Sequence, residues 1–61
     1  MNDNDFRDLI DEAYREAIIS AFTSLFNGLV EDEDALWPPK AFQKAVRIAG
    51  KARDIAKEAL G

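Results

Sequence analysis

The first half of the chain repeats its hydrophobic residues at intervals of three and four positions. This spacing lines them up along one side of an α-helix, which has about 3.6 residues per turn. Asn4 or Asp5 is the expected N-cap, with no Glu placed to complete a capping box. Gly28 marks the expected end, because glycine readily takes the left-handed conformation that follows many helices. The pattern therefore predicts a helix over residues 5–28.

The second half shows helical spacing again, directly after Pro38 and Pro39. Proline is favourable in the first turn of a helix, where its missing N–H has no partner to lose. Trp37 precedes this turn and is expected to pack back on it as a hydrophobic staple. The predicted contact line repeats at four- and three-residue intervals, as in a heptad, and consists of Ala41, Ala45, Ile48, Ala52, Ile55 and Ala59. The pattern predicts a helix over residues 38–60, with Gly61 at the position after its end.

An acidic segment, residues 29–37, connects the two predicted helices. Asp32 is expected to cap a short turn within it. A connection this short returns the chain antiparallel to itself. No strand-like alternation and no internal repeat interrupts the two patterns. The sequence therefore predicts one all-α domain over residues 1–61, an antiparallel two-helix hairpin.

The first predicted helix carries more apolar surface than one partner helix can cover. No charged residue occurs from position 17 to position 30, and a partner helix covers a stripe only about 100° wide. The stripe expected to face the second helix consists of Ile10, Tyr14, Ile18, Ala21, Leu25 and Leu29. A further stripe of Ile19, Phe22, Phe26 and Val30 would stay in water. Burying its isoleucine and two phenylalanines would recover about 5–8 kcal/mol.

This apolar surplus predicts that the hairpin assembles. A chain of this length buries only about 60% of the surface that its unfolded form exposes, so its core is marginal, and most soluble oligomers are symmetric homo-oligomers, dimers above all. Two hairpins would form a dimeric four-helix bundle. The same surface would also suit a different protein, and the sequence leaves both occupants open. The residues expected at this oligomer or partner interface are Ile18, Ile19, Phe22, Leu25, Phe26, Val30 and Trp37.

The composition offers little for catalysis or metal binding. The 61 residues include no cysteine and no histidine, so disulfides, thiolate nucleophiles and the usual zinc ligands are missing. The hydroxyl groups of Ser20, Thr23 and Ser24 have no histidine base to activate them. Tyr14 lies on the apolar stripe, which suits a packing role. We therefore expect no enzymatic activity, no metal site and no cofactor.

Charge is distributed unevenly along the chain. Residues 1–37 hold ten acids and two bases, whereas residues 38–61 hold six bases and two acids, and the net charge is −4. Four of the bases follow one face of the second predicted helix, namely Lys40, Lys44, Arg47 and Lys51. This face is a candidate site for nucleic acid or an anionic nucleotide. The acidic net charge and the lack of a nucleic-acid-binding motif make this the alternative function.

The N-terminal sequence and the hydropathy bear on where the protein works. The first residues are acidic and lack the pattern of a signal peptide, and the longest apolar run has three residues. We therefore expect a cytoplasmic protein without a membrane partner. Compact acidic chains without catalytic residues are common among phage and mobile-element products. The predicted function is that of a small homo-oligomeric helical module that binds a larger protein and regulates or inhibits it.

Overall fold

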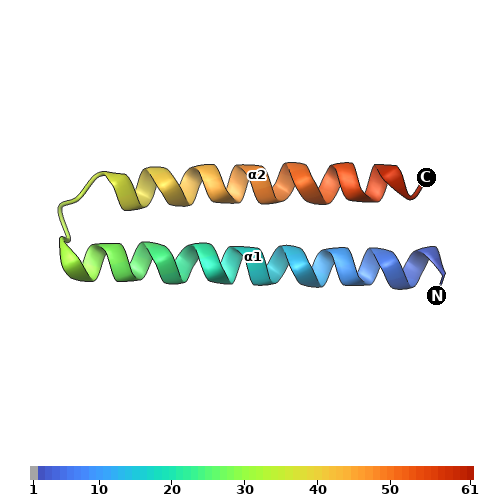
Figure 1. The fold of residues 1–61 in the computed structure, drawn as a ribbon, viewed down its shortest axis with the longest axis horizontal. Helices are drawn as coiled ribbons and strands as arrows, with labels where there is room; N and C mark the ends of the chain where they lie inside the picture. Colours follow the sequence, from blue (N-terminus) through green and yellow to red (C-terminus); the bar gives the residue numbers. More distant parts are fainter. Residues whose placement is uncertain (1) are drawn as a thin grey trace.

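The computed structural model describes residues 2–61 and consists of two long antiparallel helices, α1 (Asp3–Glu31) and α2 (Trp37–Ala59), as Figure 1 shows. The predicted all-α hairpin is confirmed. The Cα positions extend over 46 × 15 × 7 Å, and the smallest of these dimensions is about the width of one helix backbone. The hairpin is therefore a single layer of helices. A single layer has no interior in which side chains can be enclosed.

Helix α1 begins earlier than the sequence predicted. Asn2 is its N-cap, and the Asn2 side chain accepts a hydrogen bond of 3.0 Å from the Asp5 N–H. The Asp5 carboxylate in turn accepts one of 3.3 Å from the Asn2 N–H, which closes a capping box. The expectation of a cap at Asn4 or Asp5 without a box was wrong, because an aspartate fills the position usually held by glutamate.

The end of α1 also differs from the prediction, since Gly28 does not terminate the helix. The helix continues to Glu31, and the N–H of the C-cap residue Asp32 donates to the Gly28 carbonyl at 3.2 Å. Gly28 is buried, and a Cβ atom at this position would lie 2.8 Å from Cγ of Pro38. It would lie 3.2 Å from Cη2 of Trp37. The glycine therefore serves the close approach of the two helices rather than a left-handed turn.

The connection contains the turn expected at Asp32. The Ala35 N–H donates to the Asp32 carbonyl at 3.1 Å, and the Asp34 N–H donates to the Asp32 side chain, also at 3.1 Å. An aspartate that bonds its own backbone in this way favours turns over helix continuation. Helix α2 then begins at Trp37, one residue earlier than predicted, with proline in its first turn.

The far end of α2 has the glycine termination that the sequence predicted. Gly61 has a φ of +88°, and its N–H donates to the Glu58 carbonyl at 3.0 Å. At the other end, Trp37 is the first residue of α2, and its indole approaches Gly28 across the hairpin. The tryptophan therefore takes part in the contact between the helices, which the predicted staple on its own helix did not anticipate.

The helices pack along one predicted stripe and one unpredicted line. On α1 the half-buried residues include the predicted stripe of Ile10, Tyr14, Ile18, Ala21, Leu25 and Leu29. On α2 the half-buried line consists of Phe42, Val46, Ala49, Arg53, Ala56 and Leu60. The predicted contact line of α2 was wrong, because its six residues, from Ala41 to Ala59, stay exposed.

Both lines of α2 follow heptad spacing and are offset by one residue, or about 100° around the helix. The line that packs against α1 carries the larger side chains Phe42, Val46 and Leu60, whereas the exposed line is mostly alanine. Contact through the larger side chains removes more apolar area from water. At the loop end, the close approach of Pro38 to Gly28 holds α2 in the same rotation about its own axis, with this line facing α1.

Candidate interaction surfaces

The single chain leaves most of its large hydrophobic side chains in water. Among residues 2–61 only Gly28 and Pro38 are buried, and no large aliphatic or aromatic side chain is fully covered. The exposed large hydrophobic residues are Phe6, Leu9, Ile19, Phe22, Phe26, Val30, Leu36, Trp37, Ile48 and Ile55. Exposed apolar surface of this extent in a small domain is typical of interaction sites.

The size of the exposed surface leads to the same conclusion. The chain exposes 4845 Å² to solvent, whereas a globular protein of 6.8 kDa is expected to expose about 3,950 Å². The difference is about 900 Å². Each partner in a standard protein–protein interface buries about 800 Å². The surplus therefore matches one side of one interface of ordinary size.

The predicted interface residues do not form one patch. Ile18 and Leu25 are half-buried between the two helices. Four others are exposed on α1, and we call Ile19, Phe22, Phe26 and Val30 the aromatic stripe. Trp37 belongs to α2 and borders a hollow between the helices at the loop end. The set thus divides between the contact inside the hairpin and two separate outer surfaces.

A second apolar surface lies between the helices on one face of the hairpin. Three shallow hollows follow one another along this face and share lining residues. We call this surface the interhelical groove, and its central residues are Ala13, Ala17, Ala41, Ala45, Ile48 and Ala52. The residues from α2 belong to the line that was predicted to meet α1. The predicted line therefore forms one side of this groove and does not make the contact with α1.

The interhelical groove and the aromatic stripe lie on opposite faces of the hairpin. Phe26 follows the groove residue Ala17 by nine positions, as Phe22 follows Ala13. Nine positions at about 100° each amount to two and a half turns, which places the two sets on opposite sides of α1. None of the three hollows is lined by a residue of the aromatic stripe.

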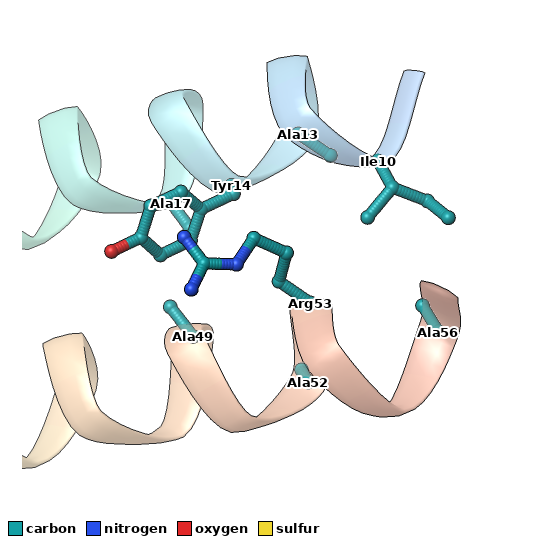
Figure 2. A pocket seen from close by; sticks show the side chains of 8 residues that line it. All are labelled: Ile10, Ala13, Tyr14, Ala17, Ala49, Ala52, Arg53 and Ala56. Carbon is teal, nitrogen blue, oxygen red and sulfur yellow. The ribbon is translucent and has the colours of Figure 1, made fainter. Parts of the chain in front are cut away.

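Tyr14 and Arg53 meet at the hollow near the chain ends, as Figure 2 shows. The Arg53 guanidinium carbon lies 4.3 Å from the centre of the Tyr14 ring, a cation–π contact. The Arg53 Nε also lies 3.3 Å from Oδ1 of Asp54. Arg53 occupies a heptad position between Ala49 and Ala56, whose small side chains leave room for it. This pair was not predicted from the sequence, although the seven-residue spacing from Val46 to Leu60 through Arg53 indicates that Arg53 lies on the packed side of α2.

An ion pair joins the two helices beside this contact. The Lys57 Nζ lies 2.6 Å from Oδ1 of Asp11. The hydrogen bond from Lys57, together with its positive charge, holds the pKa of the Asp11 carboxyl below its usual value. Asp11 precedes Phe22 by eleven positions, close to three full turns. The ion pair therefore lies on the same face of the hairpin as the aromatic stripe.

The predicted anion-binding residues Lys40, Lys44, Arg47 and Lys51 are all exposed on α2. They lie on the side of α2 that is turned away from α1, because they fall half a turn from the packed line. Lys44 also borders the interhelical groove beside Ile48. Neither ion pair found among residues 2–61 involves these four bases.

The two long edges of the interhelical groove carry opposite charges. Lys44 and Lys51, seven residues apart, follow the edge formed by α2. Glu16 lies next to Ala17 on the side of α1 that faces away from α2. All three side chains are exposed. The groove is therefore an apolar strip with a basic edge and an acidic edge.

The features that bear on function are the surfaces described above. In the part of the chain that the structure describes, neither helix has an apolar stretch long enough to cross a membrane. The chain matches no protein-family model, no curated protein and no solved structure at a significant level.

Proposed function

We propose that the protein is a non-enzymatic helical interaction module of the cytoplasm that self-assembles into a dimeric four-helix bundle and binds a larger protein to regulate or inhibit it. The observation that carries the proposal is the uncovered apolar surface on both faces of a single-layer hairpin. Stable domains consist of two or more packed layers around a shared core. A second hairpin laid on the first supplies the missing layer and creates that core.

The presence of two separate apolar surfaces supports the second part of the proposal. One face of the hairpin suffices for contact with a second copy, so the other remains for a different protein. The aromatic stripe suits that role because its two phenylalanines, Phe22 and Phe26, are more than half exposed, and aromatic residues are enriched in protein–protein interfaces.

Light scattering at micromolar concentration tests the assembly. A dimer has a mass of about 13.6 kDa, twice the 6.8 kDa of one chain. We expect this mass, together with a melting temperature that rises with protein concentration, because folding and association are coupled in such dimers. A fully helical species of 6.8 kDa that melts at the same temperature at all concentrations would contradict the proposal.

The alternative function is binding of nucleic acid or an anionic nucleotide through Lys40, Lys44, Arg47 and Lys51. The observation in its favour is that these four bases form an exposed row on α2. Titration with a polyanion at two salt concentrations separates the two functions, because phosphate contacts weaken strongly as salt rises. We expect no tight salt-sensitive binding. Tight binding that a Lys44→Glu, Arg47→Glu variant loses would favour the alternative.

A further inference from the structure

We propose that the second copy occupies the interhelical groove, with a twofold axis parallel to the helices, so that α1 of each copy lies on α2 of the other. This inference rests on the proposed self-assembly and specifies its face and its orientation. Both helices contribute apolar side chains to the groove, with Ile48 from α2 and Ala13 and Ala17 from α1, and the exposed Ile55 continues the line of Ile48 along α2. The hairpin as a whole exposes a surplus of about 900 Å², which is about what each partner of a standard interface covers.

The opposite face is less suited to a second copy. The aromatic stripe belongs to α1 alone, and the neighbouring side of α2 presents Gln43, Asp54 and Lys57. A bundle built on that face would enclose Asp54 and the ion pair between Lys57 and Asp11. Removing such charges from water costs several kcal/mol per ion, which their mutual attraction often fails to return.

Two hairpins can meet at the groove with a twofold axis in either of two directions. With the axis parallel to the helices, α1 lies on α2 of the partner subunit. With the axis across the helices, α1 lies on α1 and α2 lies on α2 of the partner subunit. The charged edges distinguish the two directions, because the acidic edge belongs to α1 and the basic edge to α2.

The parallel axis places unlike charges together. The acidic edge of each copy then follows the basic edge of the other, whereas the crossed axis places Glu16 near another acidic edge and Lys44 and Lys51 near another basic edge. Like charges in contact oppose association, and complementary charges select orientation and partner.

A parallel twofold axis also fixes the register, because the rotation leaves each residue at its own height. Within the hairpin, residues at equal height have numbers that sum to about 66 or 67, as Gly28 with Pro38 and Tyr14 with Arg53 show. Glu16 therefore lies level with Lys51 of the partner subunit. Ser20 lies within one residue of the level of Ile48 of the partner subunit, and both positions are directed toward the other layer.

Single-cysteine variants test this arrangement, because the chain has no cysteine of its own. Ser20→Cys and Ile48→Cys are prepared separately, mixed under oxidising conditions and analysed by mass spectrometry without reductant. We expect most of the disulfide in the mixture to join one chain of each variant, with little bonding in either variant alone. Asp54→Cys on the opposite face is the control and should bond with neither.

The same samples separate this inference from the proposed function. The crossed axis would bring the middle of α2 near its own copy, so a dominant disulfide between two Ile48→Cys chains would overturn the orientation. If light scattering shows a dimer but no disulfide forms between Ser20→Cys and Ile48→Cys, the placement of the second copy on the interhelical groove is wrong. The proposed self-assembly would still stand. A chain that stays monomeric at all concentrations would overturn both.

Discussion

The double substitution Ile48→Asp, Ile55→Asp is expected to dissociate the protein and unfold it. Both side chains are about half exposed in one hairpin, at 49% and 55%, and both border the face on which we place the second copy. Covering the exposed half of each side chain contributes about 0.7–1.5 kcal/mol, and a carboxylate enclosed there without a partner costs more. Because the isolated hairpin has no buried core, losing the contact should cost most of the helical signal. Circular dichroism and light scattering at micromolar concentration measure the two effects.

The matched control replaces the two phenylalanines of the aromatic stripe, as Phe22→Asp, Phe26→Asp. It changes the same number of large apolar residues to the same charged residue on the opposite face. We expect the dimer mass and most of the helical signal to persist, because phenylalanine and aspartate have similar helix propensities and both positions are more than half exposed. Dissociation of this variant, with the groove variant remaining dimeric, would assign the assembly to the aromatic stripe instead.

The helices and their pairing could be predicted from the sequence because hydrophobic periodicity extends over many turns. The predicted stripe on α1 from Ile10 to Leu29 is the one that faces α2. Helix ends depend on a few local contacts and were predicted less well. At Gly28 the residue type suggested a helix end, but the decisive fact is the nearness of Pro38 in the folded chain, which no local pattern contains.

The surfaces could be predicted only in part, because their division depends on the rotation of α2. The sequence showed that the second half of α1 has more apolar residues than one partner can cover, and the exposure of Ile19, Phe22, Phe26 and Val30 agrees with it. It also contained two heptad lines on α2, one residue apart. Choosing between them required comparing side-chain sizes in the packed hairpin, so the interhelical groove became visible only in three dimensions.

Gly28→Ala and Gly50→Ala are expected to change stability in opposite directions, although each replaces a helical glycine with the best helix former. The gain in helix propensity is about 1 kcal/mol in both cases. At Gly50 nothing else lies within 4 Å of the added methyl group, so the gain remains. At Gly28 the methyl group would lie 2.8 Å from Cγ of Pro38. The proline ring is rigid and adjoins the loop, so the helices must separate.

Overpacking of this kind costs about 1–3 kcal/mol, and the upper part of that range applies where a rigid ring must move. We therefore expect Gly28→Ala to lower the melting temperature by several degrees and Gly50→Ala to raise it by about 4–8 °C, as about 1 kcal/mol does in a domain of this size. Thermal unfolding at one fixed protein concentration measures both, since assembly makes the midpoint concentration-dependent. Equal stabilisation by the two substitutions would mean that the helices do not approach closely at Gly28, and the rotation of α2 that exposes the interhelical groove would lose its anchor at the loop end.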